Sequence, residues 1–127
     1  MHEYTWGPQY ILGQPDIDDQ HHVFFDLLAR IENEFDTTDD LVYEIKLLEE
    51  LQLYARFHFQ SEENIYEKLG LDGIEAHRAA HRELMDQLEQ QTYLFMRERD
   101  KETLIQLLFR WLVEHTLGED RAMLENA

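Results

Sequence analysis

The sequence has no cysteine, and this absence removes several kinds of chemistry at once. Without thiols the chain can form no disulfide, hold no iron–sulfur cluster and build no thiolate zinc site. Long apolar runs are also missing: the longest covers only residues 93–96, whereas a transmembrane helix needs roughly 20. The first residues show neither a basic nor an apolar segment of a secretory signal, so we expect a cytoplasmic protein.

Basic residues are scarce as well, with 11 Lys and Arg against 28 Asp and Glu and a formal net charge of −17. Such a surface repels phosphate backbones and anionic lipid headgroups, so we expect neither nucleic acid nor a membrane as a partner. The chain of 127 residues is 43% hydrophobic, which suffices for one domain with its own core. We therefore predict a single domain over residues 1–127.

Proline is confined to Pro8 and Pro15, and Gly7 and Gly13 lie in the same short stretch. These residues favour turns and extended backbone, so residues 1–17 are predicted to form an extended N-terminal arm. In residues 18–127 no proline occurs, no strand-type alternation of useful length is present, and apolar residues recur at helical spacing. This second part is predicted to be a helical bundle.

Four helices can be drawn in that part. The first covers about 18–34, and the second follows the N-capping segment 37–40 and runs to about 69, where Gly70 can end it. Asp72 and Glu75 have the spacing of a capping box and are expected to open the third, which ends near 99. The fourth runs from Asp100 to 116 or 117, before Gly118. Short connections between long helices make neighbours antiparallel, so we predict an all-α, up-down-up-down four-helix bundle.

Histidines fall on the apolar faces of these helices. Residues four apart lie only about 40° apart around a helix, so His58 and Glu62 share one face, as do His77 and His81. His21 and His115 continue apolar rows of the first and fourth helices. Asp120, five residues after His115, would lie about 140° away on a continuous helix. We expect Gly118 to break the helix and return Asp120 to the core, although a plain helix stop is an alternative.

So many buried polar groups need a common partner. Burying one polar group without a hydrogen bond costs about 1–3 kcal/mol, which makes a metal-free interior of this kind expensive. Calcium and magnesium prefer oxygen ligands, and closed zinc sites take four ligands. Imidazole with carboxylate suits iron, copper, nickel or zinc, and seven ligands exceed the need of one ion. The residues therefore predict two ions that share carboxylate bridges.

With these motifs in view, the sequence resembles the hemerythrin family, specifically the single-domain bacteriohemerythrins. The resemblance covers essentially the whole chain, and Trp6 in the arm fits it too. Its matching segments are Asp-Asp-Gln-His at 18–21, His-Phe-Gln-Ser-Glu-Glu at 58–63, His-Arg-Ala-Ala-His at 77–81, and the stretch from Trp111 through His115 to Asp120.

The resemblance implies a non-haem di-iron site, cycling between Fe2+ and Fe3+, that binds dioxygen reversibly. In the family pattern His77, His81 and His115 hold one iron, and His21 and His58 hold the other. Glu62 and Asp120 bridge the pair, together with an oxo or hydroxo bridge. One coordination position is then left for dioxygen. Ordinary core packing is the alternative role of the residues expected to line its pocket, which are Leu112, Trp111, Phe24, Phe25 and Phe59.

We therefore expect an oxygen-binding protein rather than an enzyme, for storage, sensing, or delivery to an oxygen-using enzyme as recipient. The alternative is a di-iron redox enzyme such as an oxidase, a peroxidase or a nitric-oxide-handling protein. No Glu has a His three residues later, which weighs against the carboxylate-rich oxygenases. His22 is expected to face solvent, with a rotated first helix that exchanges it for His21 as the alternative, and His2 is expected to have no role in the site. The oligomeric state is left open.

Overall fold

The computed structural model describes residues 5–125, apart from the side chain of His115. Four rods account for nearly all of this part, and it contains no strand, which confirms the predicted all-α four-helix fold. The rods are α1 (Pro15–Phe35), α2 (Leu41–Leu69), α3 (Ile74–Glu98), and a fourth built from α4 (Lys101–Arg110), a π-helical segment η2 (Trp111–Leu117) and α5 (Gly118–Glu125). Within residues 5–125 no helix is both long and apolar enough to cross a membrane.

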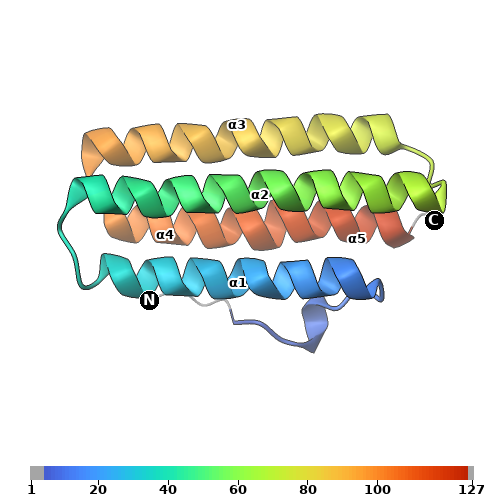
Figure 1. Ribbon diagram of the computed structural model, residues 1–127, viewed down its shortest axis with the longest axis horizontal. Coiled ribbons are helices and arrows are strands. Elements are labelled where there is room, and N and C mark those ends of the chain that lie inside the picture. The colour runs from blue at the N-terminus through green and yellow to red at the C-terminus, as the bar shows by residue number, and fades with distance from the viewer. Residues whose placement is uncertain (1–4, 126–127) are drawn as a thin grey trace.

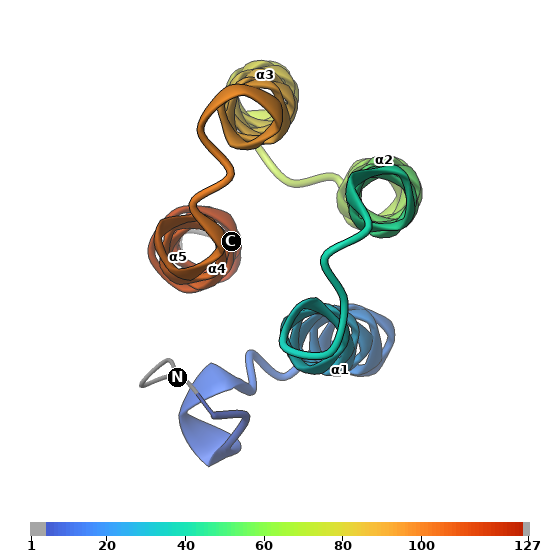
Figure 2. The ribbon, with the colours of Figure 1, turned by 90° about the vertical axis from the view of Figure 1, so that its left-hand side faces the viewer.

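The rods lie side by side along one axis. Seen from the end, they occupy the corners of a four-sided arrangement, with α4 and α5 on a common line (Figure 2). The chain colour runs leftward along α1, rightward along α2, leftward along α3 and rightward again along α4 and α5 (Figure 1). Successive rods therefore run in opposite directions, and residues far apart in the sequence meet inside the bundle.

Most of the predicted helix boundaries are found where local chemistry requires them. The carboxylate of Asp40 accepts hydrogen bonds from the backbone N–H groups of Val42 and Tyr43, which have no partner within the helix. Gly70 ends α2 with a φ of 70°, in the left-handed region that favours glycine. Asp100 caps α4 by accepting from the N–H of Thr103 at 3.1 Å. These three boundaries were correctly predicted.

Two predicted starts were wrong. The capping box at residues 72–75 does not form: α3 begins at Ile74, Gly73 precedes it with a φ of 83°, and no side chain caps its first turn. Glu75 instead pairs with Arg78 on the helix surface. The first helix begins at Pro15 rather than at about residue 18, because proline fits the first turn, where its missing N–H is not needed.

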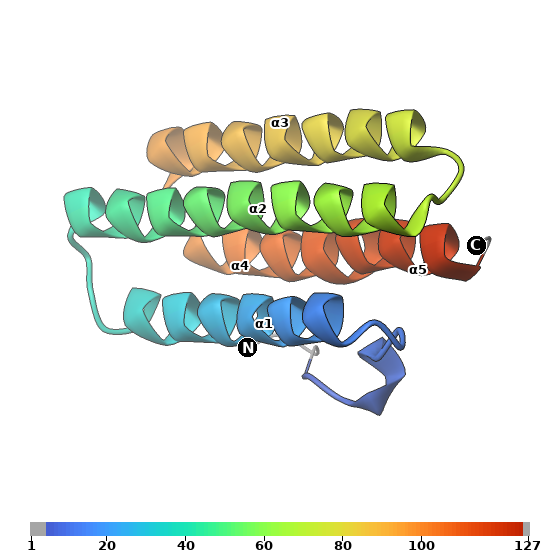
Figure 3. The ribbon, with the colours of Figure 1, turned by 45° about the vertical axis from the view of Figure 1, so that its right-hand side comes forward.

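The N-terminal arm is shorter and more folded than predicted. It contains one turn of 3-10 helix, η1 (Pro8–Tyr10), and lies along the first turns of α1 (Figure 3). The rings of Trp6 and Tyr10 pack against Phe25 at centroid distances of 5.3 and 5.0 Å. Arg121 of α5 donates to the carbonyl of Gln9. The arm is thereby attached to both the first and the last rod.

Asp18 fastens the end of the arm to α1. Its two carboxylate oxygens accept from the backbone N–H groups of Leu12 and Gly13, at 2.8 and 3.0 Å. Asp18 is itself buried, and it lies one turn before His21 on the same helix. The arm thus constrains the segment of α1 that carries the first candidate ligand.

Candidate metal centre

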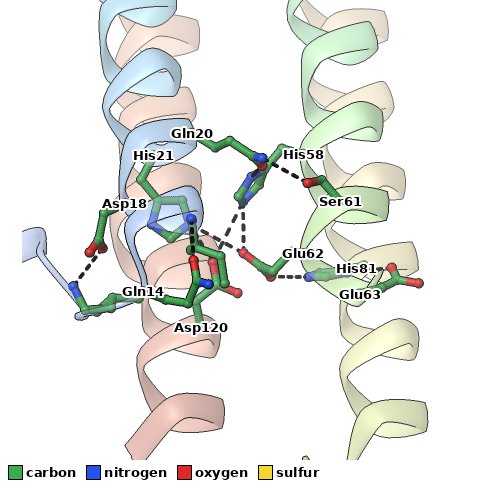
Figure 4. Close-up of polar contacts among 12 residues, drawn as sticks. Gln14, Asp18, Gln20, His21, His58, Ser61, Glu62, Glu63, His81 and Asp120 are labelled. Atoms are coloured by element: carbon green, nitrogen blue, oxygen red, sulfur yellow. Dashed lines mark hydrogen bonds and ion pairs between the residues drawn. The ribbon is translucent and has the colours of Figure 1, made fainter. Parts of the chain in front are cut away.

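Polar side chains from all four rods meet in the interior of the bundle. Each of the six whose side chains are described is buried, with exposed fractions between 0% and 4%. They are His21 from α1, His58 and Glu62 from α2, His77 and His81 from α3, and Asp120 from α5. Figure 4 shows His21, His58, Glu62, His81 and Asp120 pointing toward one another between the helices.

Glu62 lies between two pairs of histidines. Its Oε1 atom is 2.9 Å from Nε2 of both His77 and His81. Its Oε2 atom is 3.0 Å from Nε2 of His58 and 3.5 Å from Nε2 of His21. Each oxygen of this one carboxylate therefore faces a different pair of imidazoles, which is the arrangement that a carboxylate needs to bridge two ions.

Asp120 divides its oxygens in the same way. Its Oδ2 atom lies 2.7 Å from Nε2 of His21, and its Oδ1 atom lies 3.3 Å from Nε2 of His77. Two groups of four ligand atoms result, and within each group all atoms lie within 4.8 Å of one another. Both groups contain Glu62 and Asp120; one adds His21 and His58, and the other adds His77 and His81.

The donor set fits a pair of transition-metal ions. Imidazole nitrogens and carboxylate oxygens suit iron, copper, nickel or zinc, and the two shared carboxylates suit adjacent ions. Nε2 of His58, Oε2 of Glu62 and Oδ1 of Asp120 are buried and lie 3.0 to 3.3 Å from another polar atom of the cluster, but none of these contacts has the geometry of a hydrogen bond. Buried polar atoms are seldom left in that state, so these atoms favour cations over a metal-free interior.

A π-helical segment, not a helix break, carries Asp120 to the cluster. The fourth rod continues through η2 into α5, and Gly118 does not adopt the left-handed conformation. The prediction that Gly118 ends the helix was therefore wrong. In a π-helix, hydrogen bonds join residues five apart, so residues at that spacing lie nearer one face than in an α-helix. This change of winding brings Asp120, rather than a neighbouring residue, inward.

The close contacts between imidazoles and carboxylates shift the pKa values of several cluster residues. Burial disfavours the charged imidazoles of His58 and His77, but contacts with Asp120 and Glu62 outweigh it and raise the pKa of each to about 9. The pKa of His21 is raised for the same reason, again against burial. Burial opposes ionisation of Glu62, yet its contacts with Asp120 and the histidines hold its pKa well below the usual range. Without metal, protons compensate the two buried carboxylates.

A second layer of residues orients the imidazoles. Nδ1 of His81 lies 2.7 Å from the carboxylate of Glu63, and Nδ1 of His58 lies 2.8 Å from the side-chain carbonyl of Gln20. Because carboxylate and carbonyl oxygens only accept, Nδ1 must carry the proton in both rings. The lone pair of a neutral imidazole is then on Nε2, the atom that faces the cluster.

These orienting residues are themselves held. The guanidinium of Arg78 lies 3.3 Å from Glu63, and the side-chain amide of Gln20 donates to Ser61 at 2.9 Å. The sequence interpretation assigned no role to Gln20 or Glu63. Their positions beside ligand residues were a signal, but spacing alone did not show which acceptor each histidine would meet.

Aromatic rings surround the side of the cluster that faces the middle of the bundle. Phe59 stacks on His81 with ring centroids 4.3 Å apart, and Phe24 meets His58 edge to face at 5.4 Å. Trp111 contacts both phenylalanines, at 5.7 Å from Phe24 and 6.1 Å from Phe59. The indole N–H of Trp111 donates to the backbone carbonyl of Leu84, so no polar group of this ring is left free.

The other two expected pocket residues are also buried. Leu112 is fully buried in the hydrophobic core. Phe25 packs against Trp6 of the arm and lies 6.2 Å from Phe109, a buried residue of α4, so it lies between the arm and the fourth rod. The roles of all five residues at a ligand pocket stay predictions.

Three histidines remain, of which only His22 has a described side chain. The side chain of His115 and the whole of His2 lie outside the described part of the chain. His22 is half exposed, as expected, and its ring stacks on Trp6 at a centroid distance of 4.8 Å. His22 therefore does not compete with His21 for the cluster.

Comparison with known proteins agrees with this geometry. Residues 12–127 match the family model described as the hemerythrin HHE cation-binding domain. A bacteriohemerythrin of Clostridium acetobutylicum is 24% identical over 131 residues, covering 96% of this chain and 99% of the relative. A hemerythrin-like protein of Naegleria gruberi is 24% identical, covering 92% and 87%, and a bacteriohemerythrin of Stenotrophomonas maltophilia is 25% identical, covering 93% and 77%. No solved structure matches the chain significantly.

Proposed function

The chain belongs to the hemerythrin family, and from that premise we propose that it binds dioxygen reversibly at a pair of iron ions. The observation that carries the proposal is the position of Glu62, whose two oxygens face different pairs of histidines. When bound, the iron pair supplies two electrons and one open coordination position, which together allow dioxygen to bind and leave.

The ligand set is assigned by combining family pattern and geometry. His77 and His81 are assigned to one iron with His115, whose place rests on the family pattern alone. His21 and His58 are assigned to the other iron. Glu62 and Asp120 would be shared by the two ions, and an oxo or hydroxo group would complete the bridge in the family pattern. In that pattern the position for dioxygen would be on the iron held by His21 and His58.

The protein keeps this site reversible by orienting ligands and excluding water. Glu63 and Gln20 fix the protonation of two imidazoles, so Nε2 stays available to metal. The rings of Phe24, Phe59 and Trp111 form a dry wall beside the ligands. An apolar wall slows the arrival of protons and the loss of reduced oxygen, which favours binding over turnover. The function proposed is accordingly that of an oxygen carrier, store or sensor, not an enzyme.

Anaerobic reconstitution with Fe2+ tests the proposal. The chain is expected to take up two irons, to colour on exposure to oxygen, and to lose the colour when oxygen is removed, through repeated cycles. A single bound ion would contradict the paired site. Two irons that oxidise in one cycle and consume added reductant with oxygen would instead identify a di-iron redox enzyme.

A further inference from the structure

One buried hydroxyl beside the cluster has no role in the site described so far. Tyr66 lies on α2 four residues after Glu62, and therefore on the same face of that helix. Its side chain is fully buried. Its ring meets the ring of His77 edge to face, with centroids 5.0 Å apart and planes at 70°. The phenol thus lies against a candidate ligand, in the interior.

The hydroxyl of Tyr66 has no hydrogen-bond partner. Leaving such a group buried and unpaired costs about 1–3 kcal/mol, so native structures seldom keep one without a reason. Bound cations would satisfy the unpaired oxygens of Glu62 and Asp120, which are electron-pair donors. They would not satisfy a neutral phenol, whose O–H needs an acceptor.

The ring contact with His77 indicates which acceptor is near Tyr66, because Nε2 of His77 lies 3.3 Å from Oδ1 of Asp120. Burial raises the pKa of its hydroxyl, and the negative charges of Asp120, Glu62 and Asp18 raise it further. A phenol has an ordinary pKa of about 10, so the hydroxyl carries its proton at neutral pH and is a donor. The carboxylate of Asp18 already accepts from two backbone N–H groups, and that of Glu62 already faces four imidazoles. Of the two unpaired carboxylate oxygens, Oε2 of Glu62 faces His58 and His21, whereas Oδ1 of Asp120 faces His77, the histidine that Tyr66 contacts. A carboxylate oxygen has two lone pairs, so Oδ1 of Asp120 can bind metal and still accept a hydrogen bond, and we take Asp120 as the acceptor.

We propose that Tyr66 is a positioning residue of the metal centre, whose hydroxyl donates a hydrogen bond to the Asp120 carboxylate when that carboxylate binds metal. The inference rests on the proposed function, because it concerns the loaded site. A hydrogen bond to a bridging carboxylate withdraws electron density from it and so favours the lower charge of the metal pair. Tyr66 would thereby raise the reduction potential of the irons and slow their oxidation to the ferric state.

The test compares Tyr66→Phe with Tyr93→Phe, which removes the same hydroxyl from an exposed ring on α3. In the metal-free chain, Tyr66→Phe is expected to unfold at the same temperature as wild type or higher, since it removes an unpaired buried group. In the iron-loaded chain, it is expected to shift the midpoint potential to a more negative value. Oxidation to the ferric form in air should become at least about threefold faster. Tyr93→Phe should change none of these quantities.

Several outcomes would overturn the inference. Equal midpoint potentials of loaded wild type and Tyr66→Phe would do so, as would a metal-free Tyr66→Phe that is less stable than wild type. A visible phenolate-to-iron band in ferric wild type that Tyr66→Phe lacks would show direct ligation instead of a hydrogen bond. A wild-type chain that takes up no pair of irons would overturn the proposed function as well, whereas the other results leave that function standing.

Discussion

Nε2 of His21 and Oδ2 of Asp120 lie 2.7 Å apart, although 99 residues separate them in the chain. The contact joins α1 to α5, the first and last helices of the bundle, and both residues are buried. Any metal held at this point ties the two ends of the chain together. Ligand loss here is therefore expected to affect both metal content and folding stability.

Asp120→Asn is expected to lower the iron content from two ions per chain to one or fewer. The amide keeps the size of the side chain but cannot supply two anionic oxygens to two ions. Metal analysis after desalting measures the change. Glu119→Gln is the control, because Glu119 is the adjacent residue, is exposed and loses the same charge. Equal iron contents in the two variants would remove Asp120 from the ligand set.

Glu63→Gln is expected to weaken metal binding by about 10- to 100-fold, the usual effect of removing an orienting acceptor from a ligand histidine. Affinity can be measured with Zn2+ against a competing chelator. Glu67→Gln is a matched control, because Glu67 lies on the same helix and contacts the same Arg78, at 3.0 Å, whereas it is Glu63 that pairs with His81. A loss of the same size in Glu67→Gln would point to the arginine network rather than to His81.

The metal-free chain is expected to lose stability as the pH rises from about 6.5 to 9. His58 and His77 have a pKa of about 9 when folded and an ordinary pKa of 6.5 otherwise, so their contribution is complete below 6.5 and lost through 9. The lowered pKa of Glu62 has the opposite effect: its carboxylate stabilises the folded chain at neutral pH, and this stabilisation is lost as the pH falls into the acid range. Thermal unfolding should show a fall of about 5 °C or more over this alkaline range.

Bound metal should reverse this dependence of folding stability on pH, because ligation requires deprotonated imidazoles. The metal-loaded chain is expected to keep its stability up to pH 9 and to release metal in acid. Binding of Zn2+ at pH 7.5 should release about two protons, from His58 and His77. Calorimetric titration in buffers of different ionisation enthalpy counts them. Metal binding without proton release would mean that these two histidines are not ligands.

Leu112→Ala should speed oxidation of the loaded iron in air, because it opens the buried apolar region next to the proposed oxygen site to water. It should also cost about 2–5 kcal/mol of unfolding free energy, as large-to-small changes in a core do. Leu108→Ala is the control, since Leu108 is equally buried one turn earlier. Both variants should lose stability, but only Leu112→Ala should oxidise faster; identical oxidation rates would exclude Leu112 as part of the pocket.

The fold class and the family follow from the residue pattern alone, and the spacing of histidines and carboxylates points to the cluster. Helical periodicity places His58 with Glu62, and His77 with His81, on apolar faces, and four such faces can be buried only against one another. This reasoning depends on spacing along single helices, which a sequence displays directly. It also identified the capping segment 37–40, Gly70 and Asp100 as boundaries, because capping is local chemistry.

How those faces meet depends on the packing of the helices against one another, which the residue pattern does not display. The π-helical winding before Gly118, the acceptors that Gln20 and Glu63 offer to histidines of other helices, and the buried hydroxyl of Tyr66 depend on how helices are rotated and shifted along their axes. Packing of an apolar stripe has a similar free energy for many such rotations and shifts of the helix. A hydrogen bond is lost when its donor and acceptor move apart by only a fraction of an ångström. Periodicity therefore indicates which side chains point inward, but not which atoms touch.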